Sequence, residues 1–183
     1  EGDISSRLVN VMKLLVGRFS GGLAMTSVLA CLFFGAISGS SPATVVAIGS
    51  IMLPALIREG YGERFSIGLI TSSGSLGILI PPSIPMILYA LMMNVSVAEM
   101  FLAGFLPGVF IGTCLMVYAF LSGRKYGWRS EERYSLKDAV RIIREGLWSL
   151  FLPVLVLGGI YGGVFTPTEA AAVSVVYALV VEL

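Results

Sequence analysis

Five stretches of this sequence contain no Lys, Arg, Asp or Glu. They cover residues 19 to 57, 65 to 98, 100 to 123, 146 to 168 and 170 to 181. A charged side chain at the centre of a bilayer costs roughly 2.5 to 3.5 kcal/mol on insertion scales. Uncharged stretches of this length therefore predict helices that enter the membrane, and the charged residues between them mark loops and surface helices.

The first two uncharged stretches are too long to be single straight spans. At about 1.5 Å per residue, residues 19 to 57 would form a helix of roughly 58 Å and residues 65 to 98 one of about 51 Å, against an apolar thickness of roughly 30 Å. Residues 100 to 123 would form a helix of about 36 Å, which crosses once with a modest tilt. Each of the first two stretches must therefore contain a turn or a break.

The turn in the first stretch is predicted at residues 38 to 42, which read SGSSP. Gly39 can adopt the positive φ of a tight turn, Ser41 suits the cap of a second helix, and Pro42 suits its first position. Residues 19 to 57 are therefore expected to form a helical hairpin. Gly35 and Gly39 also form a GxxxG pattern, so close helix packing is an alternative role for these glycines.

The break in the second stretch is predicted at residues 72 to 85, which read SSGSLGILIPPSIP. Adjacent prolines remove backbone donors and clash with the preceding turn, so the helix is expected to stop and restart there. A simple proline kink is the alternative. Unwound backbone at membrane depth is tolerated only where it packs inside protein or lines a polar cavity. Discontinuous helices of this kind are typical of transporter sites, where helix N-termini suit anions and freed carbonyl groups suit sodium.

Two further segments have the spacing of amphipathic surface helices, residues 4 to 16 and residues 135 to 148. Ser135 and Asp138 are spaced as a variant capping box at the start of the second. Residues 124 to 145 hold seven cationic side chains, so this loop is expected on the cytoplasmic side: Arg124, Lys125, Arg129, Arg133, Lys137, Arg141 and Arg144. By parity the loop at 58 to 64 is also cytoplasmic. If residues 1 to 18 lie on that side as well, the 19 to 57 hairpin enters and leaves the membrane on one face.

The composition excludes several classes of function. Hydrophobic residues make up 56% of the 183 residues, charged residues 13%, and the mean hydropathy is +0.92, which indicates an integral membrane protein. The net charge of +1 gives no basic surface for nucleic acid. The chain has no histidine, which excludes a Ser-His-Asp triad or a histidine zinc site within it, and an enzyme is not expected.

The only charged residue between the last two uncharged stretches is Glu169. It lies three residues after Thr166, with Pro167 between them, which is the spacing of a capping box. We expect Glu169 to cap a helix, and ion binding is the alternative because any ionisable group near the membrane raises a functional question.

The order of these motifs resembles that of the large membrane subunit of tripartite ATP-independent periplasmic (TRAP) transporters. The resemblance covers nearly the whole chain, and its most specific pieces are SGSSPA at 38 to 43, GILIPPSIP at 77 to 85 and TPTEAAA at 166 to 172. It implies an all-α integral membrane protein with an elevator-type fold of two inverted repeats, each with a re-entrant hairpin and a discontinuous helix. This chain would hold about one repeat, so we expect it to be a piece of a longer protein that does not transport by itself.

The resemblance also divides the chain. The expected parts are an amphipathic arm helix at 1–18, a re-entrant hairpin at 19–57, a discontinuous helix and a transmembrane helix at 65–123, a basic cytoplasmic loop with an amphipathic helix at 124–148, and the start of a second inverted repeat at 149–183.

The function implied by the family is sodium-coupled uptake of an organic acid, of C4-dicarboxylate or sialic-acid type. A periplasmic binding protein would deliver the substrate, and a small membrane subunit would be a partner. The location would be the cytoplasmic membrane of a bacterium or archaeon, with sodium as coupling ion and no other cofactor.

The site residues implied by the family fall in the two breaks. Ser38, Gly39, Ser40 and Ser41 match the tip of the first hairpin, and Gly74, Ser75, Gly77, Pro81, Pro82 and Ser83 match the broken helix. Sodium prefers oxygen ligands, so our hypothesis is a sodium site of hydroxyl groups and freed carbonyl groups. The hydroxyls would come from Ser38, Ser40, Ser41 and Ser75, and the carbonyls from Gly74 and Gly77.

Two other functions remain open from the sequence. In a channel or pore-forming subunit, the SGSS turn would be a re-entrant selectivity loop. In a non-transporting membrane scaffold, the glycines would serve helix packing only. A carrier differs from a channel in that its flux saturates and depends on a sodium gradient, and a scaffold binds no substrate.

Overall fold

The computed structural model describes residues 3–128 and 136–182, and the regular structure in them is α-helical, as the sequence predicts. The helices are α1 (Asp3–Val16), α2 (Gly22–Ser38), α3 (Ser41–Arg58), α4 (Glu63–Gly74), α5 (Leu76–Leu79), α6 (Ile84–Met93), α7 (Val97–Tyr126), α8 (Leu136–Tyr161) and α9 (Pro167–Glu182). The expected cap at Ser135 and the cations Arg129 and Arg133 lie outside the described residues.

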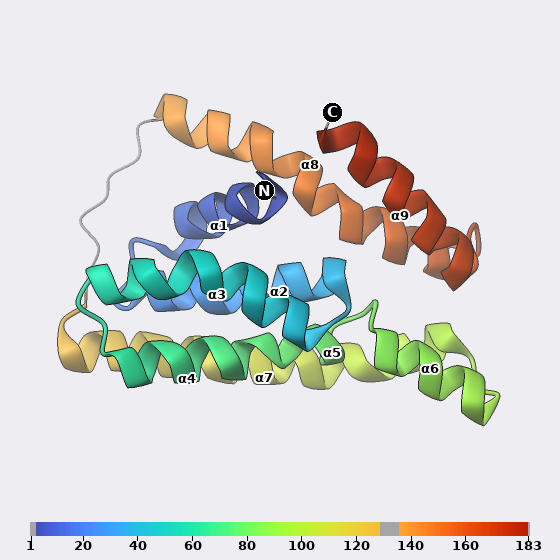
Figure 1. Ribbon diagram of the computed structural model, residues 1–183, viewed down its shortest axis with the longest axis horizontal. Coiled ribbons are helices and arrows are strands. Elements are labelled where there is room, and N and C mark those ends of the chain that lie inside the picture. The colour runs from blue at the N-terminus through green and yellow to red at the C-terminus, as the bar shows by residue number, and fades with distance from the viewer. Residues whose placement is uncertain (1–2, 129–135, 183) are drawn as a thin grey trace.

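The hairpin formed by α2 and α3 is the centre of the molecule (Figure 1). Its two helices pack against α4, and α2 also packs along α7. On the other side α1 lies between the hairpin and α8, and α9 folds back beside α8. The turn of the hairpin therefore lies where α5, α6 and the α8–α9 pair approach one another.

Two apolar clusters hold these helices together. The larger one joins α1 to the hairpin, α4 and α5, and its fully buried side chains include Leu8, Met12, Val28, Ile48 and Leu76. The smaller cluster surrounds Phe101 of α7 and joins it to α8 and α9 through Leu152, Val156, Ile160 and Ala170. The hairpin turn lies between the two clusters.

Three described segments are long and apolar enough to cross a membrane: Ser41–Arg58, Glu63–Met93 and Val97–Tyr126. The outer face of α7 carries exposed Leu102, Leu106 and Phe110 at intervals of four residues, so a continuous apolar stripe faces outward. Such a stripe suits contact with lipid. These segments agree with the integral membrane protein that the sequence predicts. The re-entrant course of the hairpin stays a prediction.

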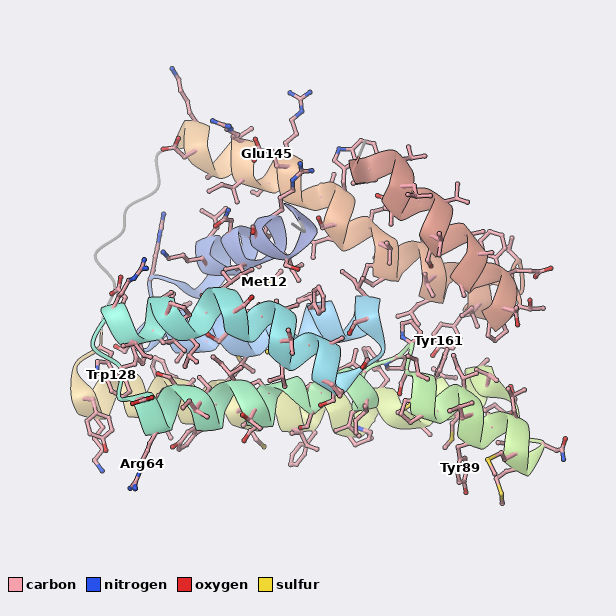
Figure 2. The ribbon with its side chains drawn as sticks, in the orientation of Figure 1. Met12, Arg64, Tyr89, Trp128, Glu145 and Tyr161 are labelled. Carbon is pink, nitrogen blue, oxygen red and sulfur yellow. The ribbon has the colours of Figure 1, made fainter. Side chains whose placement is uncertain are left out.

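The loops at 58 to 64 and after α7 meet at one end of the molecule. Tyr61 and Trp128 stack with ring centroids 4.3 Å apart, and the backbone N–H of Gly21 donates to the carbonyl of Trp128 at 2.7 Å. Figure 2 shows Arg64 and Trp128 at this end, with Tyr89 and Tyr161 at the opposite end. Both loops therefore lie at the same end of the described structure, and their position on the cytoplasmic side stays a prediction.

The two helices expected to be amphipathic, α1 and the first part of α8, have more contacts with the rest of the fold than the sequence indicated. Residues 136 to 148 form the first part of α8, which continues without interruption through the expected boundary at 148/149 to Tyr161. The apolar face of α1 buries Leu8, Val11 and Met12 against the protein, whereas Leu15 at its end is exposed. Both helices are thus built into the fold as well as amphipathic.

Candidate functional site

The hairpin turn consists of two residues and is fixed by hydroxyl groups. Gly39 has φ +61°, which a glycine adopts without strain, and its N–H donates to the carbonyl of Gly35 at 2.8 Å. The hydroxyls of Ser38 and Thr44 lie 3.0 Å apart, and Thr44 Oγ1 donates to the carbonyl of Ser40 at 2.8 Å. The backbone N–H of Ser40 donates to Ser38 Oγ at 3.3 Å. The turn is therefore held in one conformation by its own side chains.

The second helix of the hairpin begins one residue earlier than the sequence suggested. The N-cap is Ser40, with φ −136° and ψ 123°, and Ser41 is already helical. The reason is that the N–H of Thr44 donates to the carbonyl of Ser40 at 3.1 Å, which is the first helical hydrogen bond of α3. Pro42 still lies in the first turn, where its missing N–H costs nothing.

The broken helix contains an extended segment between α5 and α6. It covers residues 80 to 83 and includes a cis peptide bond between Pro81 and Pro82. The buried hydroxyl of Ser83 donates back across the break to the carbonyl of Ile78 at 2.8 Å. A side chain thus satisfies a carbonyl that the helix leaves free, as expected for an unwound segment inside protein.

The turn and the break are in direct contact. The backbone N–H of Ile84, the first residue of α6, donates to the carbonyl of Gly39 at 3.2 Å. A Cβ atom added to Gly39 would lie 2.8 Å from the carbonyl oxygen of Pro82. A Cβ atom added to Gly77 would lie 2.8 Å from Thr44 Oγ1 and 3.0 Å from the carbonyl oxygen of Ser40. Glycine at both positions lets the two backbones approach this closely.

The structure brings together most of the site residues that the sequence suggested. Those at the junction of turn and break are Ser38, Gly39, Ser40, Gly77 and Pro82. Ser41 begins α3 directly beside them, and Pro81 is fully buried in the break.

Three of the suggested residues have other local partners. The hydroxyl of Ser75 donates to the carbonyl of Ser72 at 2.7 Å, within its own stretch of chain. The hydroxyl of Ser83 donates to the carbonyl of Ile78. Gly74 is buried where α4 meets Val45 of α3, further along the hairpin. The structure therefore centres the candidate site on Gly77 rather than on Ser75.

Thr44 is part of this site although sequence reasoning did not single it out. Its buried hydroxyl links Ser38 to Ser40 and faces Gly77. A threonine one turn into an apolar helix commonly bonds to the carbonyl four residues before it, which was the only available signal. The hydroxyl of Ser73 in α4 is also buried and has no hydrogen-bond partner among the described residues, but it does not line the cavity beside the turn.

Charge at the junction comes from helix ends. No charged residue occurs between residues 19 and 57 or between 65 and 98. The N-termini of α3 and α6 both begin at the junction, where α2 and α5 end. N-terminal ends carry partial positive charge and C-terminal ends partial negative charge, so the junction offers attraction for an anion and for a small cation without any ionisable side chain.

A cavity of about 200 Å³ opens beside the junction. Its walls come from the turn (Ser38 and Gly39), from Pro82, and from apolar side chains of α6, α7 and α8. Ser174 of α9 also lines it, and its hydroxyl donates to the carbonyl of Ala170 at 2.7 Å. The cavity shows that the turn and the break are exposed to a common space bounded by the last two helices. Sequence reasoning gave no signal for Ser174.

Residues 1–183 match the family described as "Tripartite ATP-independent periplasmic transporter, DctM component". The chain belongs to this family. It is 48% identical to the C4-dicarboxylate TRAP transporter large permease protein DctM of Vibrio cholerae over 176 residues, which cover 96% of this chain and 39% of that protein. This match confirms the resemblance drawn from the motifs. The relatives are transporter permease subunits, which are not enzymes, in agreement with the expectation from the sequence.

Other members of the DctM family differ in the solute that their names give. The ectoine/5-hydroxyectoine TRAP transporter large permease protein UehC of Ruegeria pomeroyi is 45% identical over 182 residues, covering 100% of this chain and 42% of that protein. The isethionate TRAP transporter permease protein DctMQ of Oleidesulfovibrio alaskensis is 42% identical over 181 residues, covering 98% of this chain and 28% of that protein. The chain thus spans about two fifths of the length of the DctM relative from Vibrio cholerae.

Proposed function

We propose that this chain provides the first hairpin and the first broken helix of the transport site of a sodium-coupled secondary transporter. The observation that carries the proposal is the contact between Gly39 and Ile84, which joins the hairpin turn to the break. Two helix N-termini and the backbone carbonyl groups of the turn meet there without a charged side chain. This set of groups suits an organic anion together with a sodium ion.

The sodium ion is proposed to bind first and to prepare the anion site. Candidate ligands are the hydroxyls of Ser38, Ser40 and Ser41 and carbonyl groups of the turn and of Gly74 and Gly77. Ser75 also stays a candidate, because a hydroxyl that donates to the carbonyl of Ser72 keeps its oxygen lone pairs for a cation. A bound cation adds positive charge beside the N-termini of α3 and α6, so an anion binds more tightly when sodium is present. Coupling of this kind is typically about 1 to 3 kcal/mol and is reciprocal.

The complete protein is proposed to work as an elevator built from two inverted repeats, of which this chain supplies one. The hairpin is proposed to be re-entrant, with its turn at membrane depth. The proposed location is the cytoplasmic membrane of a bacterium or archaeon. The proposed partners are a small membrane subunit and a periplasmic binding protein that delivers an organic acid, for example of C4-dicarboxylate or sialic-acid type.

The test is uptake by the complete transporter in liposomes, with the small subunit and the binding protein present. Succinate, ectoine, isethionate and N-acetylneuraminate are the labelled probes. The proposal expects saturable uptake of at least one probe, and only under an inward sodium gradient. Flux that rises linearly with solute concentration would favour a channel instead. Uptake that needs no sodium would refute the coupling, and absence of both binding and uptake would favour a scaffold.

A further inference from the structure

A basic groove lies between α1 and the first part of α8, and no residue of the hairpin turn lines it. It has a volume of about 630 Å³, and its walls include Arg7, Lys137, Val140, Arg141, Arg144 and Trp148. The two helices pack against each other at Gly146, where an added Cβ atom would clash with the side chain of Val11. Figure 2 places Glu145 on the stretch of α8 that runs past α1. The groove is therefore built by two helices in firm contact.

The charge of the groove is strongly positive. Four cations line it, and the one carboxylate among its lining residues is Glu145. That carboxylate is already paired, because Arg141 Nε donates to Glu145 Oε1 at 2.8 Å. Asp138 is the other acidic residue on this part of α8, and it does not line the groove. Lys137 and Arg144 form no ion pair with any residue in the described ranges 3–128 and 136–182. They are free to bind an anion.

The rim of the groove is apolar and continues into the membrane part of α8. Val140 and Trp148 line the groove and are 66% and 56% exposed, although one is hydrophobic and the other aromatic. Leu147, the neighbour of Trp148 in the chain, is 60% exposed. Exposed Phe151 and Val154 follow Leu147 on the same side of the helix, four and seven residues later. An apolar path thus leads directly from the cations towards the apolar segment of α8. Tryptophan at such a position is typical of the boundary between headgroups and acyl chains.

We propose that this groove binds the phosphate headgroup of an anionic phospholipid. Lys137 and Arg144 contact the phosphate, and the acyl chains lie along Leu147 and Phe151. A soluble anion would use the cations but leave the adjacent apolar side chains in water, whereas an amphiphilic anion satisfies both. Basic pockets beside membrane helices on the cytoplasmic side are suited to anionic lipid headgroups. The bound lipid would fill the space between α1 and α8.

Native mass spectrometry of the complete large subunit, delipidated and titrated with lipid, tests the proposal. Dioleoyl phosphatidylglycerol should bind with measurable affinity, and dioleoyl phosphatidylcholine should bind much more weakly. Because each cation near a membrane surface contributes roughly 1 kcal/mol, Lys137→Gln with Arg144→Gln should weaken phosphatidylglycerol binding about tenfold to thirtyfold. The charge-preserving pair Lys137→Arg with Arg144→Lys should keep most of the affinity.

The matched control is Arg124→Gln with Lys125→Gln at the end of α7. It removes two positive charges from exposed residues that do not line the groove. This pair should leave phosphatidylglycerol binding unchanged. Equal loss in both Gln pairs, no loss in either pair, or equal binding of the two lipids would overturn the proposal. Full competition by inorganic phosphate at concentrations similar to the lipid would also overturn it, because the apolar rim would then contribute nothing.

Discussion

Gly77 lies where the backbone of the broken helix packs directly against the hairpin turn. A Cβ atom added to Gly35 would lie 2.7 Å from the Cα atom of Gly77. A Cβ atom added to Gly77 would in turn lie too close to Thr44 and Ser40. The carbonyl of Ser40 cannot retreat easily, because it accepts hydrogen bonds from both the N–H and the hydroxyl of Thr44. The packing of the candidate site thus depends on glycine at this position.

Gly77→Ala should therefore destabilise the complete protein, although alanine is the better helix former. Overpacking of this kind costs about 1 to 3 kcal/mol. Gly68→Ala on α4 is the control, because an added Cβ there meets no atom within 4 Å. That change should be neutral or should stabilise the helix by about 0.5 to 1 kcal/mol. Thermal unfolding in detergent measures both, and equal melting temperatures for the two variants would contradict the proposed contact.

The capping box predicted at the start of α9 is confirmed. The backbone N–H of Thr166 donates to Glu169 Oε2 at 2.8 Å, and the N–H of Glu169 donates to Thr166 Oγ1 at 3.3 Å. Thr166→Ala should then lower the free energy of unfolding by about 0.5 to 2 kcal/mol. Glu169→Gln keeps an acceptor oxygen and should retain most of the uptake by the complete transporter. Loss of uptake in the Gln variant at normal expression would point to a direct ion role for Glu169.

At the scale of helices, length and charge predicted the main features. The uncharged residues 19 to 57 could not be one span, and the structure divides them at the predicted SGSS turn into α2 and α3. The three prolines at 81, 82 and 85 likewise predicted the end of one helix and the start of another. These features are local, because glycine, serine and proline impose them on their own neighbours.

The features that sequence reasoning missed depend on contacts between distant segments. Nothing near Thr44 indicates that Gly77 will lie against it, and nothing near Ser174 indicates a shared cavity with the hairpin turn. The continuity of α8 is a different case. Residues 146 to 152 contain no proline, and a single glycine such as Gly146 is tolerated inside a helix, so nothing in this stretch requires α8 to end.

The two expected cytoplasmic loops are joined by an aromatic cluster. Tyr61 stacks on Trp128, and Phe65 lies 5.0 Å from the same ring, centroid to centroid. Burial raises the pKa of Tyr61 to about 12, so its phenol stays neutral at physiological pH and the cluster carries no charge of its own there. Cationic Arg64 and Arg124 flank it in the chain, as expected for a cytoplasmic membrane boundary.

This arrangement predicts the labelling of single cysteines in intact cells. In a background with Cys31 and Cys114 replaced by alanine, Gly62→Cys and Lys125→Cys should both resist a membrane-impermeant thiol reagent. Val95→Cys, in the turn between α6 and α7, is the control and should react from outside. All three sites are exposed, so access to the reagent depends on the side of the membrane. Reaction of only one of the two loop cysteines would contradict the topology.

At the scale of the whole molecule, the chain forms one hairpin and one broken helix around a junction without charged side chains. The two loops at one end, the α6–α7 turn at the other and the apolar outer face of α7 fit a protein that lies across a membrane. The α8–α9 pair closes the cavity beside the hairpin turn. Under the proposed function, oxygen ligands and helix ends rather than ionisable side chains would hold the sodium ion and the solute.

The sodium dependence of uptake by the Ser38→Ala variant tests this account most directly. The hydroxyl of Ser38 contacts Ser40 and Thr44 at the turn, and in the proposed site its oxygen coordinates sodium by an ion–dipole contact. If that contact contributes about as much as a polar contact to a charged group, roughly 1.5 to 3 kcal/mol, the sodium concentration for half-maximal uptake should rise about tenfold or more. Ser50→Ala is the control, because that exposed hydroxyl donates to Ala47 on the same helix. If Ser38→Ala only lowered the amount of folded transporter, the maximal rate of uptake would fall and the sodium concentration for half-maximal uptake would not change. Parental sodium dependence in Ser38→Ala, or uptake without sodium, would contradict the account.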